Sequence, residues 1–144
     1  MSFKNEMTLK FKAKSVNESF ARSAVAAFLL PLDPTLEEIS DIKTAVSEAV
    51  TNCIVHAYEK GEEDIELACS IDGDTVHITV SDTGVGISDI EKARQPFFTT
   101  KPEDERSGMG FTLMETFMDN LEVLPNQPLG VIVKMSKKIG NKGG

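Results

Sequence analysis

Acidic, amide and glycine residues that could do chemistry gather in three short stretches of the 144-residue chain. Glu48 and Asn52 lie four positions apart, the spacing that places two side chains on one face of a helix. At about 100° per residue, both lie on the shoulder of an apolar stripe that runs through the same stretch. A carboxylate can act as a base, and an amide oxygen suits a hard cation such as Mg²⁺. The alternative is a partly solvated helix flank.

The second stretch, "SDTGVGIS" at residues 81–88, ends a hydrophobic alternation with Asp82 and continues into two glycines. Gly84 and Gly86 lack a Cβ, so the backbone there can adopt left-handed conformations and approach a ligand closely. The third stretch contains Gly108 and Gly110 before a helical pattern. A helix start offers unpaired N–H groups to phosphate oxygens. The structural alternative for residues 81–88 is a tight turn after a strand. For Gly108 and Gly110 it is a flexible hinge at a helix start.

The common phosphate-binding fingerprints do not match these glycines. A dinucleotide pattern would need glycine at position 89 or 113, where the chain has Asp89 and Leu113. The P-loop pattern and the motif set of the common protein kinases are also absent from the sequence. If the chain binds a nucleotide, it therefore does so through a different sequence motif.

Order and spacing of the three stretches resemble the N, G1 and G2 boxes of the GHKL ATPases, the group of gyrase, chaperone and histidine-kinase nucleotide domains. The boxes are Glu48–Asn52, Asp82–Gly86 and Gly108–Phe111. The strings "SEAVTNCIVHAY" and "ARQPFFTTKPEDERSGMGF" are most similar to the sporulation anti-sigma factors that are also serine kinases. That resemblance covers nearly the whole chain.

The resemblance implies a role for each site residue. Asp82 accepts a hydrogen bond from the exocyclic amine of adenine, Asn52 holds Mg²⁺, and Glu48 is the general base. The remaining nucleotide-binding residues expected from it are Gly84, Gly86, Thr99, Lys101, Arg106, Ser107, Gly108, Met109, Gly110 and Phe111. Arg22 matches a partner-contact position. Val131 departs from the family, which commonly has threonine after the glycine that corresponds to Gly130.

Three functions follow from this resemblance. The first is a Mg-ATP-dependent protein serine kinase that also binds and silences a sporulation sigma factor and phosphorylates an anti-anti-sigma protein. The second is a module in which ATP orders the residue 82–108 lid without phosphoryl transfer. The third is the ATP-binding part of a histidine kinase, which needs a separate phosphoacceptor hairpin that these residues leave no room for. His56 is more typical of a structural histidine than of a phosphorylated one.

Periodicity predicts the elements that must position these residues. Alternating residues 7–13, 65–71, 76–80, 121–123 and 131–135 predict strands, and apolar residues at helical spacing predict helices from Ser15 to near Pro31, Thr35 to about Ala57 and Gly108 to Asp119. Ser15 with Glu18, and Thr35 with Glu38, predict capping boxes. The expected fold is an α+β two-layer sandwich, with a mixed, mostly antiparallel sheet and helices on one face.

Composition limits the class of protein. The length predicts one domain over residues 1–136, followed by a flexible basic tail at 137–144. A net charge of −8 argues against direct nucleic-acid binding, and neither a membrane span nor a signal peptide is visible, so a cytoplasmic protein is expected. Cys53 and Cys69 lack metal-ligand spacing and are expected to be small buried hydrophobes. A homodimer is expected from the resemblance alone.

Overall fold

The computed structural model describes residues 3–57, 63–82, 110–125 and 130–140. The elements in chain order are β1 (Lys4–Lys12), α1 (Val16–Phe28), a 3₁₀ turn (Leu30–Leu32), α2 (Leu36–Ala57), β2 (Asp64–Asp72), β3 (Thr75–Asp82), α4 (Gly110–Phe117), β4 (Asn120–Pro125) and β5 (Val131–Lys138). No helix in these four ranges is long and apolar enough to cross a membrane.

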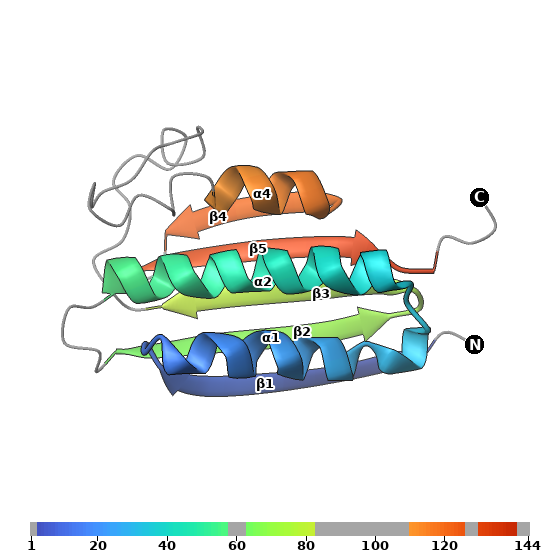
Figure 1. Cartoon of the computed structure of the whole chain (residues 1–144), viewed down its shortest axis with the longest axis horizontal. Helices are drawn as coiled ribbons and strands as arrows, with labels where there is room; N and C mark the ends of the chain where they lie inside the picture. The colour runs from blue at the N-terminus through green and yellow to red at the C-terminus, as the bar shows by residue number, and fades with distance from the viewer. Residues whose placement is uncertain (1–2, 58–62, 83–109, 126–129, 141–144) are drawn as a thin grey trace.

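The strands form one five-stranded sheet in the order β1-β2-β3-β5-β4. Every neighbouring pair is antiparallel. Helices α1, α2 and α4 lie on one face of the sheet, with α2 between the other two (Figure 1). The predicted α+β two-layer sandwich is therefore confirmed, and β1 lies at an edge of the sheet.

The period-two pattern decides which face of each strand meets the helices. In β2, Ile65 and Leu67 are fully buried and alternate with exposed or half-buried polar residues, and β3 repeats the pattern. Because antiparallel pairing sets Leu67 opposite Val80, the apolar sets of adjacent strands share one face. The core forms where this face meets the apolar stripes of the helices, chiefly Val46, Ala49 and Val50 of α2.

One predicted capping box forms and the other does not. The Thr35 hydroxyl accepts a hydrogen bond from the Glu38 backbone N–H at 3.0 Å, and Glu38 Oε1 accepts one from the Thr35 N–H at 2.8 Å. This reciprocal pair begins α2 as predicted. Ser15 makes no side-chain capping bond, because its backbone is already helical (φ −55°, ψ −33°) and carries the chain directly into α1.

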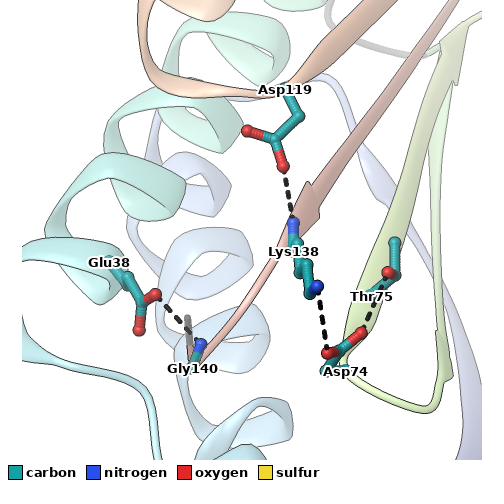
Figure 2. A network of polar contacts seen from close by, with 6 residues as sticks. All are labelled: Glu38, Asp74, Thr75, Asp119, Lys138 and Gly140. Carbon is teal, nitrogen blue, oxygen red and sulfur yellow. Dashed lines mark hydrogen bonds and ion pairs between the residues drawn. The ribbon is translucent and has the colours of Figure 1, made fainter. Parts of the chain in front are cut away.

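The ordered fold continues four residues beyond the boundary at 136 that the sequence predicts. Strand β5 runs to Lys138, Ile139 is 1% exposed, and the Gly140 N–H donates to Glu38 Oε2 at 3.0 Å. Figure 2 shows this contact beside the hydrogen bond from the Lys138 backbone N–H to Asp119 Oδ2 at 2.7 Å. The lysines at 137 and 138 favour a basic tail in the sequence. In the structure, the backbone of both lysines extends the pairing of β5 with β3.

Candidate functional site

Buried polar side chains in the described ranges occur in two elements only. Thr51 and Asn52 lie near the C-terminal end of α2 and are 6% and 5% exposed, and Asp82, the last residue of β3, is 3% exposed. Helix α2 packs over β3, and the C-terminal ends of both lie at the same end of the molecule (Figure 1). Asn52 and Asp82, 30 positions apart in sequence, are therefore both buried polar side chains toward the same end of an otherwise apolar core.

The Asn52 amide is incompletely satisfied. Its Nδ2 is buried and has no hydrogen-bond partner within the part of the chain that the structure describes. Leaving such a group unpaired typically costs about 1–3 kcal/mol, and buried polar groups are rarely left so. An amide in this state fits a bound group that supplies oxygens, since Nδ2 can donate to a phosphate and Oδ1 can bind a hard cation.

Cys53 of α2 is buried near Asp82, and its thiol is 3% exposed. Burial raises the pKa of the Cys53 thiol well above its ordinary value, and the nearby Asp82 carboxylate raises it further. Helical phase predicts a buried Cys53, but only the packing of α2 on β3 brings it near Asp82.

Glu48 lies one turn before Asn52 on α2 and is half-buried at the edge of a surface groove. The groove has a volume of about 530 Å³ and lies between α1 and α2. Its lining includes Arg22 of α1 and Ser40, Lys43, Thr44 and Ser47 of α2. Arg22 also lies 3.7 Å from Glu18 Oε2 and is about two-fifths exposed. The structure thus connects the predicted partner-contact residue to the predicted base along one groove.

The structure places the start of α4 at Gly110, at the same end of the molecule as Asp82 (Figure 1). The helix start predicted near Gly108 is therefore found within two residues. The predicted binding residues Gly84, Gly86, Thr99, Lys101, Arg106, Ser107, Gly108 and Met109 lie outside the described residues, as does the predicted lid after Asp82. For Gly110 and Phe111 the structure gives the helical backbone. His77 is exposed on the outer face of β3.

The described residues contain no cluster of three or more histidine, cysteine or acidic side chains that could hold a metal ion. Mg²⁺ commonly keeps several waters and binds through one or two protein oxygens together with substrate phosphates. Asn52 Oδ1 fits such a mode. Val131, where the resembled family commonly has threonine, is 5% exposed in the first position of β5 and contributes to the core.

A sequence profile of the histidine kinase-like ATPase domain matches residues 11–137. The chain belongs to this family. The match spans all the described elements that hold Arg22, Glu48, Asn52 and Asp82. Membership in an ATPase family implies that the chain binds ATP, which agrees with the buried amide of Asn52, whose Nδ2 lacks a partner among the described residues.

Curated relatives in this ATPase family are similar over almost their full length. The chain is 58% identical to the anti-sigma F factor of a Thermoanaerobacter species over 98% of the chain and 99% of the relative. It is 59% identical to the anti-sigma F factor of Caldanaerobacter subterraneus, over 97% and 98% respectively. The corresponding protein of Bacillus cytotoxicus is 53% identical, over 96% and 95%. Within the ATPase family, the chain therefore belongs with the anti-sigma F factors.

Solved structures of other proteins share the fold of this chain. The RsbU and RsbW domains of a Mycobacterium tuberculosis protein match with a TM-score of 0.68 at 17% identity, covering 94% of this chain and 32% of that one. The catalytic domain of histidine kinase ThkA matches with a TM-score of 0.59 at 16% identity, covering 92% and 96%. The predicted GHKL-type fold is thereby confirmed.

Proposed function

We propose that the chain is an anti-sigma factor and a Mg-ATP-dependent protein serine kinase. In this proposal it binds and inhibits a sporulation sigma factor and phosphorylates an anti-anti-sigma protein on serine. The name shared by relatives that are 53% to 59% identical supports the anti-sigma role. The ATPase family supports the use of ATP.

The observation that carries the kinase half of the proposal is the groove that joins Arg22 to Glu48. A protein segment lying between α1 and α2 would bring a serine hydroxyl to the Glu48 carboxylate, one helical turn from Asn52. Arg22 and Lys43 give the groove two cationic side chains that can contact an acidic partner segment.

The chain's own residues have separate tasks in the transfer. Asp82 accepts a hydrogen bond from the adenine amine and so fixes the nucleotide at the end of β3. Asn52 would hold Mg²⁺ through its amide oxygen, and the ion would offset phosphate charge. Glu48 takes the proton of the serine hydroxyl as the new O–P bond forms and the bond from the γ-phosphorus to the leaving oxygen of ADP breaks. Bound MgATP supplies the phosphoryl group and the cation that offsets its developing charge.

Residues outside the described ranges, together with the first residues of α4, complete this proposal. Lys101 and Arg106 would neutralise phosphate charge, and Ser107 with the N–H groups of residues 108–111 would bind phosphate oxygens. Gly84 and Gly86 would let the backbone approach the purine, and Thr99 and Met109 would line the nucleotide. We also propose a homodimer in the cytoplasm; a monomer mass by light scattering at working concentration would reject the dimer.

The direct test is incubation of the purified chain with labelled ATP, Mg²⁺ and candidate sigma and anti-anti-sigma proteins. We expect stable binding of the sigma factor and label on a serine of the anti-anti-sigma protein. Label that never reaches serine on any partner contradicts the kinase half. Failure to bind any sigma factor contradicts the anti-sigma half.

Glu48→Gln separates a kinase from an ATP-gated binding module. Because glutamine cannot accept the proton, transfer should fall about 10²- to 10⁴-fold while ATP affinity stays within about twofold. Transfer is measured with labelled ATP and affinity by calorimetry. Glu37→Gln, on the exposed first turn of the same helix, is the matched control and should leave transfer unchanged. Equal transfer in Glu48→Gln and wild type would favour the module.

A further inference from the structure

The two edges of the sheet differ in how they are protected against pairing with another chain. Strand β4, at one edge, is six residues long and ends at Pro125. Short edge strands and proline are two means by which proteins prevent such pairing. Strand β1, at the other edge, is nine residues long, contains no proline and keeps an uninterrupted register with β2. Within the described ranges, no strand other than β2 pairs with β1.

Backbone hydrogen bonds show which residues of β1 face the free edge. The Gly73 N–H donates to the Phe3 carbonyl at 2.7 Å, and the Ala13 N–H donates to the Glu63 carbonyl at 2.9 Å. Antiparallel strands exchange such bonds at every second residue. Because the register between these two contacts is continuous, the odd-numbered residues of β1 bond to β2. The even-numbered residues of the strand therefore direct their N–H and C=O groups away from β2.

We propose that a second copy of this chain pairs with the β1 edge, antiparallel and centred on Thr8. The inference rests on the proposed homodimer and adds the surface that forms it. Charged side chains block an edge strand unless opposite charges meet across the new pair. With Thr8 at the two-fold axis, Glu6 lies opposite Lys10 of the other copy, twice by symmetry. Neither side chain makes an ion pair within the described ranges. An axis at Glu6 or at Lys10 would set like charges opposite each other.

The same axis sets Lys4 opposite Lys12 of the other copy at both ends of the paired strands. Lys12 Nζ lies 3.0 Å from Asp64 Oδ1, so an acidic side chain of its own chain offsets its charge. The two central pairs of Glu6 with Lys10 therefore decide the register.

Exposed apolar side chains fit this arrangement. Phe3, Val16 and Phe20 are 44%, 76% and 51% exposed and are three of the five large apolar side chains exposed in the described ranges. Phe20 packs edge-to-face on Phe11 of β1, with ring centroids 6.2 Å apart, and Val16 lies one turn earlier on α1. The proposed pairing sets Phe3 of the second copy opposite Ala13, on the helix side of the sheet and beside Phe11. Apolar surface of both copies is thereby covered.

Exchange of the two charges tests the surface and its register together. Glu6→Lys and Lys10→Glu should each raise the dimer dissociation constant at least about tenfold, because each sets like charges opposite each other at two places. An equimolar mixture of the two variants should dimerise with a constant within about threefold of wild type, because every central pair then joins opposite charges. The constants are measured by analytical ultracentrifugation without nucleotide or partner protein.

Two further variants examine the backbone and the apolar contact. Thr8→Pro removes an N–H that points to the free edge and spares the bonds to β2, so it should abolish dimerisation while circular dichroism matches wild type. Phe3→Ser should raise the dissociation constant about three- to tenfold. Leu36→Ser is the matched control, since Leu36 is 86% exposed at the start of α2, and it should leave the constant unchanged.

The outcomes separate this inference from the proposed homodimer and from the proposed activities. Wild-type protein that stays monomeric at every concentration overturns the homodimer itself. A wild-type dimer that neither charge variant weakens, or that mixing does not restore, overturns the β1 surface and leaves the dimer to another surface. Weakening by each variant with recovery in the mixture supports the inference and shows that both variants fold. Neither ATP nor a sigma factor enters the measurement, so the result is independent of both.

Discussion

At the end of the sheet where β5 finishes, polar side chains satisfy one another and the backbone. Glu38 accepts a hydrogen bond from the Thr35 N–H. It also accepts one from the Gly140 N–H, and Asp119 accepts one from the Lys138 backbone N–H (Figure 2). At the opposite end, where α2 and β3 finish, Asn52 is more deeply buried than Glu38. Its Nδ2 nevertheless has no hydrogen-bond partner among the described residues. The comparison indicates that the first end fixes the fold, whereas the second reserves hydrogen-bonding capacity for a ligand.

The largest effect should come from the ligand-binding end. Asp82→Asn replaces one acceptor oxygen by an N–H donor, which opposes the donor groups of an adenine amine. We expect ADP affinity to fall about 100-fold, since hydrogen bonds to charged groups contribute about 1.5–3 kcal/mol. Calorimetry with ADP measures this. Asp119→Asn, at the other end, should keep ADP affinity within about twofold; equal losses in the two variants would remove the distinction between the ends.

A pH dependence should arise from the core between the two ends. Burial raises the pKa of Cys69 from its ordinary value of 9.0 to about 12. Above pH 9 the unfolded chain releases this proton while the folded chain keeps it, so stability is complete below pH 9 and falls as pH rises toward 12. Between pH 8 and 10.5 the loss should be about 2 kcal/mol.

Cys69→Ala removes this titration. The free energy of unfolding, measured by denaturant titration at both pH values, should fall by about 2 kcal/mol less in Cys69→Ala than in wild type. The comparison cancels other groups that titrate in the same range. An identical alkaline loss in both proteins would show that this thiol does not resist ionisation in the folded state.

At the structural end, Glu38→Ala should destabilise the fold without affecting nucleotide binding. Both carboxylate oxygens of Glu38 accept backbone hydrogen bonds, one at the start of α2 and one from Gly140. We expect a loss of about 1–2 kcal/mol in the free energy of unfolding. Glu37→Ala removes an equal charge from the same helical turn and should cost less than about 0.5 kcal/mol. Similar losses would mean that charge, not the two bonds, accounts for the effect.

The smallest effect should come from Lys138→Ala. Its Nζ lies 3.9 Å from Asp74 Oδ2, and both side chains are more than half exposed. Such an ion pair contributes little because solvent screens it. The bond from the Lys138 backbone to Asp119 survives the substitution. Thermal and denaturant unfolding should agree with wild type to within about 0.5 kcal/mol; a larger loss would give the side chain a structural role at this end.

The elements themselves could be predicted because each has a local signal. Period-two alternation located the strands, and the Thr35 and Glu38 pair located the start of α2. The capping-box pattern gave a wrong prediction at Ser15, where the backbone is already helical and the side chain makes no capping bond. The charge of residues 137–138 also misled, since a strand ladder depends on backbone groups that lysine supplies as well as any residue.

The sequence by itself determined that Glu48 and Asn52 share one helix face and that Asp82 ends a strand, because helical and strand periods are properties of the local backbone. Only the tertiary structure decided that α2 packs on β3, which brings the Cys53 thiol near the Asp82 carboxylate and leaves Nδ2 of Asn52 buried without a partner among the described residues. Contacts between residues 29 positions apart depend on how two apolar faces pack, and no local periodicity encodes that pairing.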